Sequence, residues 1–118
     1  MSYCLPYTDE ALERLHHRED FKPGTVREVR YPMHDSPAFE TYPYIREANE
    51  KLDRFEKKMI GFCAQETLEP EHIKAILPVY EKYSKIEYMH PPFRQVFIDI
   101  CDLFREAIRL DRPVVVTL

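Results

Sequence analysis

The chain of 118 residues is about as long as one domain, and 44% of its residues are hydrophobic, which is enough for a buried core. Its 17 Lys and Arg and 21 Asp and Glu give a net charge of -4 and are mixed along the whole chain. Because no basic segment exists, the sequence argues against nucleic acid and against an anionic membrane surface as partners. No apolar run reaches the roughly 18 residues that span a bilayer, and the first residues do not resemble a signal peptide. We therefore expect a cytoplasmic protein.

The counts of cysteine and glycine exclude several kinds of site. The three cysteines, Cys4, Cys63 and Cys101, form no Cys-x-x-Cys pair, and their odd number does not suit a disulfide framework. Cys63 and Cys101 lie beside apolar stripes, where cysteine acts as a small, inert hydrophobic residue. Gly24 and Gly61 stand alone, so the sequence contains no glycine-rich phosphate loop.

The first third of the chain predicts one short helix and one short strand. Thr8 can cap a helix that runs to about His17, with acidic residues in its first turn. Pro23 and Gly24 predict a turn, and residues 25–31 alternate imperfectly between valine and charged residues, as in a short strand. The prolines that follow predict irregular backbone up to residue 42.

The rest of the chain predicts three longer helices and a terminal strand. Apolar residues at heptad-like spacing indicate a helix from Pro43 to about Cys63. Thr67 can cap a second helix, which Pro78 should kink or split. A third helix over residues 92–110 carries an apolar stripe wider than one face, and the valines of residues 114–118 are strongly β-prone.

These elements predict a mainly α fold: a small bundle of three or four helices, with a proline-rich irregular N-terminal third and one or two short β-strands. We expect a single domain over residues 1–118, in which 1–42 form the irregular third, 43–110 the helical core and 111–118 an apolar strand or tail. The strand over residues 25–31 has the C-terminal valines as its expected partner.

Pairs of the form Glu-x-x-His point to one alternative function. This spacing puts a carboxylate and an imidazole on the same helix face, as in di-iron carboxylate bundles. The placement of these pairs near helix ends fits a solvated face better than the middle of a bundle. The alternative is a small metal-binding protein or metal-dependent enzyme that holds Zn or Fe. Its candidate metal ligands are Glu13, His16, His17, Glu69 and His72.

The apolar helix faces favour a different function, protein–protein interaction without catalysis. More apolar surface is predicted than one small domain needs to bury, so we expect a small accessory or regulatory protein that binds itself and another protein. We assign it no catalytic residue and no cofactor. A nucleic-acid-binding regulator is a second alternative, which would need basic residues to converge in space. The predicted interaction residues are Tyr44, Leu52, Phe55, Met59, Phe104 and Leu118.

Overall fold

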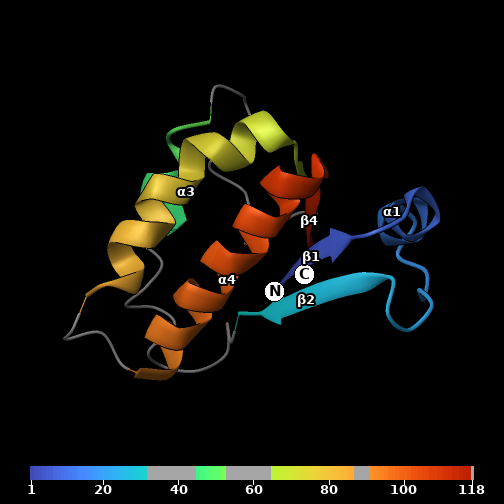
Figure 1. Ribbon diagram of the computed structural model, residues 1–118, viewed down its shortest axis with the longest axis horizontal. Coiled ribbons are helices and arrows are strands. Elements are labelled where there is room, and N and C mark those ends of the chain that lie inside the picture. Colours follow the sequence, from blue (N-terminus) through green and yellow to red (C-terminus); the bar gives the residue numbers. More distant parts are fainter. Residues whose placement is uncertain (32–44, 53–64, 87–90, 118) are drawn as a thin grey trace.

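The computed structural model describes residues 1–31, 45–52, 65–86 and 91–117 (Figure 1). These residues form an α+β fold, in which a four-stranded antiparallel sheet packs against helices. A further helical segment covers residues 45–49. In chain order the other elements are β1 (Ser2–Pro6), α1 (Asp9–His16), β2 (Val26–Arg30), β3 (Glu66–Leu68), α3 (Pro70–Ser84), α4 (Pro91–Leu110) and β4 (Val114–Thr117).

The sheet shows that the predicted mainly α bundle is wrong. Its strands lie in the order β2-β1-β4-β3, and every neighbouring pair is antiparallel. The first and last strands of the chain are therefore the two central strands, with Ser2 opposite Thr117. The expected pairing of residues 25–31 with the C-terminal valines does not form, because β1 lies between β2 and β4.

β1 and β3 are not predicted from the sequence, and each omission has a physical reason. In β1, Tyr3, Cys4 and Leu5 are all buried, because both faces of this central strand are covered. A strand buried on both faces does not alternate between apolar and polar residues, so it lacks the period-two signal. β3 is only three residues long, and its Thr67, predicted to cap a helix, belongs instead to the sheet.

Helices cover both faces of the sheet. α3 and α4 lie side by side (Figure 1). On one face of the sheet they bury side chains such as Tyr3, Leu5 and Val116. The short α1 lies over the opposite face, where Leu15 packs against Cys4 and Val115. Because successive strand residues point to opposite faces, β1 and β4 each contribute to both layers.

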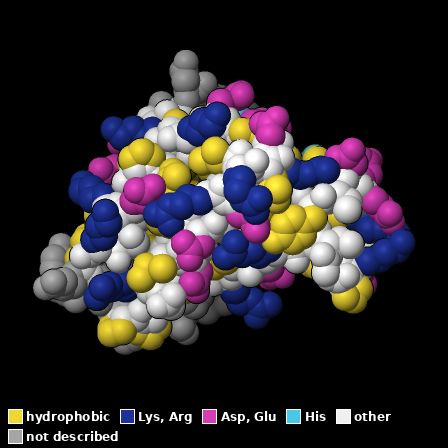
Figure 2. Space-filling model, viewed as in Figure 1, with side chains coloured by type: hydrophobic (Ala, Val, Ile, Leu, Met, Phe, Trp, Pro, Cys, Tyr) yellow, Lys and Arg dark blue, Asp and Glu magenta, His cyan; other side chains and the backbone are white. Residues whose placement is uncertain are grey.

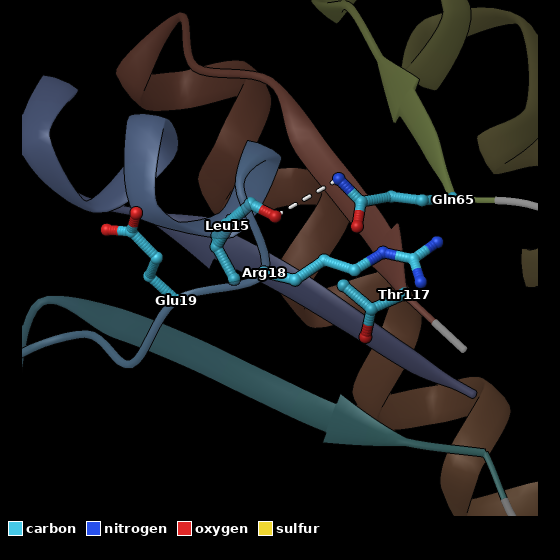
Figure 3. A pocket seen from close by; sticks show the side chains of 5 residues that line it. All are labelled: Leu15, Arg18, Glu19, Gln65 and Thr117. Atoms are coloured by element: carbon cyan, nitrogen blue, oxygen red, sulfur yellow. Dashed lines mark hydrogen bonds between the residues drawn. The ribbon is translucent and has the colours of Figure 1, made fainter.

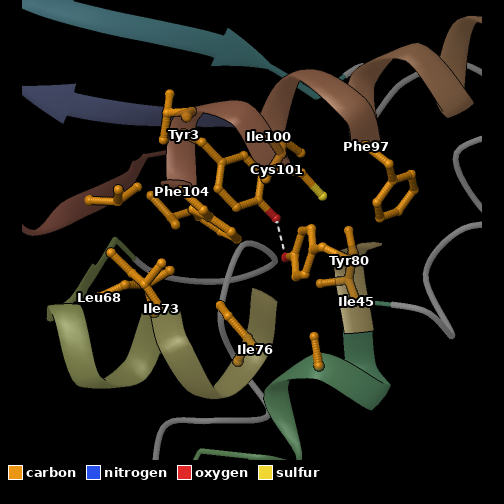
Figure 4. Packing of buried hydrophobic residues seen from close by; sticks show 14 of the residues in the cluster. Tyr3, Ile45, Leu68, Ile73, Ile76, Tyr80, Phe97, Ile100, Cys101 and Phe104 are labelled. Atoms are coloured by element: carbon orange, nitrogen blue, oxygen red, sulfur yellow. Dashed lines mark hydrogen bonds between the residues drawn. The ribbon is translucent and has the colours of Figure 1, made fainter. Parts of the chain in front are cut away.

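A cluster of aromatic side chains fills the space between the sheet and the two long helices. The phenol oxygens of Tyr3 and Tyr80 lie 2.6 Å apart, so a hydrogen bond joins β1 to α3 inside the core (Figure 4). Phe104 of α4 meets both rings edge-on, with ring centroids 5.8 Å from Tyr3 and 5.1 Å from Tyr80. Edge-to-face pairs of this kind add stability beyond simple burial of area.

The helices begin much as their sequences predict. In α1, the Ala11 N–H donates to the Thr8 hydroxyl at 3.1 Å, which confirms the predicted cap. α3 starts after Glu69 rather than Thr67, and it continues past Pro78 to Ser84, so this proline does not split the helix. Of the helix predicted from Pro43 to Cys63, residues 45–49 are helical, and residues 53–64 lie outside the described part of the chain.

α1 and α4 end in the same unusual way. Arg18 has φ of 56° and Asp111 has φ of 53°, both in the left-handed region that favours glycine. The Arg18 N–H donates to the Leu15 carbonyl, and the Glu19 N–H donates to the Arg14 carbonyl. This bond pattern is the Schellman motif, which satisfies the last carbonyls of a helix. The chain makes the motif twice without glycine.

Candidate functional site

The predicted metal ligands on α1 are exposed and take part in local hydrogen bonds. His17 Nε2 lies 3.0 Å from Glu13 Oε1, one turn away on the same helix. His16 instead reaches across to the sheet, where its Nε2 lies 3.2 Å from the Thr67 hydroxyl. The imidazoles of His16 and His17 therefore contact different parts of the molecule, Thr67 of β3 and Glu13 of α1.

The second predicted pair, Glu69 and His72, caps a helix. The Glu69 N–H donates to His72 Nδ1 at 3.0 Å, and this bond satisfies a backbone donor at the start of α3. Among the residues that the structure describes, no three His, Cys, Asp or Glu side chains gather into a group that could hold a metal ion. The Glu-x-x-His spacing thus has a structural use at this helix start.

Leu52 and Phe104, two of the predicted interaction residues, are buried within the chain. Leu52 is 1% exposed and Phe104 is 0% exposed, since both belong to the core between the sheet and the helices. The other four predicted interaction residues, Tyr44, Phe55, Met59 and Leu118, lie outside the described residues. Leu110 is the one large hydrophobic side chain that is exposed in the described part. The stripes of α3 and α4 thus pack mainly inside the molecule.

The surface over α3 and α4 mixes charges of both signs. Figure 2 shows Lys and Arg side chains interleaved with Asp and Glu on this face. Two arginines of α4 have carboxylate partners: Arg105 lies 3.0 Å from Asp102, and Arg109 lies 3.5 Å from Glu106. Paired cations of this kind offer a phosphate backbone little net positive charge.

One pocket, of about 230 Å³, opens at the end of α1 beside the end of β4. Its described lining is Leu15, Arg18, Glu19, Gln65 and Thr117 (Figure 3). The Gln65 amide donates to the Leu15 carbonyl at 3.1 Å, so it ties the start of β3 to α1. Cys4, buried in the layer below α1, has its thiol pKa raised to about 11 by burial, which keeps the thiol protonated near neutral pH. The described lining therefore contains no histidine or reactive thiol.

The clearest candidate for a binding feature is the outer edge of β2, the last strand on its side of the sheet that the described residues form. The Tyr31 N–H donates to the Met1 carbonyl and the Tyr7 N–H donates to the Thr25 carbonyl, each at 2.8 Å. In an antiparallel pair the hydrogen-bonded residues alternate, so Arg27 and Val29 direct their backbone groups toward β1. The backbone N–H and C=O groups of Val26, Glu28 and Arg30 therefore point away from the sheet.

Two of the three outward-facing residues on this edge carry a charged side chain. Glu28 and Arg30 are exposed, and both lie on the face of the sheet that carries Cys4. Ser2 donates its hydroxyl to Glu28 at 2.7 Å. Arg30 makes no ion pair within the described residues. Charged side chains on an edge strand commonly protect it from uncontrolled pairing, and they also select which strand can add there.

The sequence carries a signal for this edge that helical periodicity does not reveal. β2 reads Val-Arg-Glu-Val-Arg, and three charged residues among five are typical of an edge strand. Position in the sheet decides whether such a strand is central or at the edge, and that position depends on β1. Because β1 was not predicted, the free edge was not predicted.

Comparisons with other proteins assign no family to this chain. In the described part of the chain, no helix is both long and apolar enough to cross a membrane. No protein-family model, no curated protein and no solved structure matches this chain.

Proposed function

We propose that this protein is a non-catalytic interaction module that binds a partner by strand addition at the outer edge of β2. The observation that carries the proposal is the set of outward backbone groups at Val26, Glu28 and Arg30. An added strand gains affinity from main-chain hydrogen bonds and specificity from alternating side chains. The buried helix stripes leave this edge as the better candidate interface among the described residues.

The edge is built to accept a strand without disturbing the fold. β2 is held on its inner side by β1 along five paired residues, and no described strand pairs with its outer side. Arg27, which points to the α4 side, is fixed by an ion pair with Glu106 at 3.3 Å. A preordered strand keeps the entropy cost of association low.

A photocrosslinking experiment in expressing cells tests this function. A photoreactive residue is placed at Arg30, and the matched control places it at Glu71, which is exposed on α3. We expect a crosslinked product from position 30 and none from position 71. The additional change Glu28→Pro should abolish the product, because proline removes an outward N–H but no bond to β1.

Two results would contradict the proposal. One is equal crosslinking from positions 30 and 71, which would indicate random encounters. The other is a product from position 30 that survives Glu28→Pro with the circular dichroism spectrum unchanged, since the partner would then not use the backbone of β2.

A further inference from the structure

We infer that the strand added at β2 comes from a second copy of this chain, in an antiparallel register centred on Val29. This inference rests on the proposed function, since it names the partner of the same edge. Small homo-oligomers are most often twofold symmetric, and a twofold axis perpendicular to the sheet makes β2 antiparallel to the partner's β2. Such a pairing requires the side chains of β2 to be complementary to those of a second β2.

Strand geometry restricts the register. Residues directly opposite each other in an antiparallel pair share a face, so the axis must pass through a residue rather than between two residues. The residues that pair through hydrogen bonds must also be those whose backbone groups point outward, namely Val26, Glu28 and Arg30. Every register centred on a residue of β2 meets this second condition, so the side chains decide between them.

Charge favours one register. An axis at Glu28 would place the two copies of Glu28 opposite each other, and an axis at Arg27 or Arg30 would do the same with two arginines. Like charges directly opposite in a sheet destabilise the pairing. An axis at Val29 instead sets Glu28 opposite the partner's Arg30 and Arg30 opposite the partner's Glu28, and brings the two Val29 side chains together. Both charged pairs are then hydrogen-bonded pairs of the ladder.

The lack of an ion pair at Arg30 within the described residues supports this arrangement. Arg30 has no carboxylate partner in the described part of the chain, whereas Arg27, Arg105, Arg109 and Arg112 each have one. The Glu28 carboxylate has the Ser2 hydroxyl as its described partner, which leaves it able to accept further hydrogen bonds. An interface of one strand edge is small, so we expect a weak, reversible dimer in the micromolar range.

Sedimentation equilibrium of the purified full chain, over a series of micromolar concentrations, tests the register. We expect the wild-type protein to dimerise, and Glu28→Arg or Arg30→Glu each to weaken the dimer at least tenfold. The double variant Glu28→Arg/Arg30→Glu should restore it, because the two opposite-charge pairs are rebuilt with reversed sign. Glu71→Arg changes the net charge by the same amount as Glu28→Arg on an exposed site of α3, and should leave the dimer unchanged.

Failure of this inference can be told from failure of the proposed function. A wild-type monomer at every concentration overturns the inference, as does a dimer that ignores the single reversals or is not restored by the double one. If in those cases the crosslink at position 30 still forms with another protein and is lost on Glu28→Pro, strand addition stands with a different partner. If that crosslink is also absent, the proposed function fails with it.

Discussion

At the scale of single residues, the hydrogen bond between Tyr3 and Tyr80 is a polar contact inside the apolar core. Both phenols are fully buried, and burial is the main reason why the pKa of each is raised above its ordinary value. They therefore stay protonated, and one hydroxyl donates while the other accepts. A buried hydroxyl that loses its partner costs more than the bond itself contributes, because its desolvation is no longer compensated.

This asymmetry predicts a non-additive pair of substitutions. Tyr3→Phe or Tyr80→Phe alone should lower the free energy of unfolding by about 1–3 kcal/mol, since each leaves one hydroxyl unsatisfied. The double variant should lose less than the sum of the two, because neither hydroxyl remains. Urea denaturation of the four proteins measures this. Strict additivity would show that the two hydroxyls do not depend on each other.

At the scale of elements, the Schellman motif at the end of α1 reduces the stability of the fold, because Arg18 has a positive φ. An L-residue with a Cβ in the left-handed region is destabilised by about 1 kcal/mol, and Arg18 has no compensating side-chain bond among the described residues. Asp111 occupies the same position at the end of α4, where the short acidic side chain suits this conformation better than arginine does.

Arg18→Gly should therefore raise the free energy of unfolding by about 0.5–1 kcal/mol, because glycine removes the clash of the Cβ atom. Arg18→Ala is the matched control: it removes the guanidinium but keeps the Cβ, so stability should stay within about 0.5 kcal/mol of wild type. Thermal unfolding of the three proteins measures both. Equal stabilisation by alanine and glycine would mean that the guanidinium, and not the backbone, is responsible.

The elements also show how much of this molecule its sequence predicts. The amphipathic helices over Asp9–His16 and Pro91–Leu110 were found near their observed bounds, because helical periodicity and caps are local signals. β1 and β3 were missed, since one is buried on both faces and the other is three residues long. Without them the charged edge of β2 was not identifiable, because an edge is a property of the sheet.

The sequence contains the residues of the predicted metal site, but their spacing alone does not distinguish a metal site from a helix cap. The three-residue spacing of Glu69 and His72 lets the His72 imidazole accept a hydrogen bond from the Glu69 N–H at the start of α3. Glu13 and His17 pair on the surface of α1. The same intervals serve metal ligation and helix capping, so only the three-dimensional position separates the two uses.

At the scale of the whole molecule, a polar cluster around Glu106 fastens α4 to the sheet. Tyr7 donates to Glu106 at 2.6 Å, and Arg27 of β2 lies 3.3 Å from the same carboxylate oxygen. The hydrogen bond from Tyr7, followed by Arg27, holds the pKa of Glu106 below its ordinary value. A carboxyl whose pKa is lowered by folding stabilises the fold above its unfolded pKa, and this contribution disappears as the pH falls through the folded pKa.

Glu106→Gln should lower the free energy of unfolding at pH 7 by about 1 kcal/mol, at the low end for a charged hydrogen bond because this carboxylate is partly exposed. Its stability should also fall less than that of the wild type between pH 5 and more acidic conditions, roughly the range in which such a carboxylate titrates. Asp102→Asn, a more exposed carboxylate of the same helix, is the control and should change little. If the free energies of unfolding of Glu106→Gln and wild type fell equally as the pH is lowered, this account would be contradicted.

The position of β4 in the sheet also governs how this molecule is made. β4 joins β1 to β3, and it is the last of the strands to leave the ribosome. A nascent chain that has emerged as far as α4 can pair β1 with β2, but β3 has no neighbour until residues 114–117 appear. Because pairing between such distant segments is slow and costly, the core between the sheet and the long helices stays incomplete until β4 is available. The sheet of the described residues is complete only when residues 114–117 pair with β1 on one side and with β3 on the other.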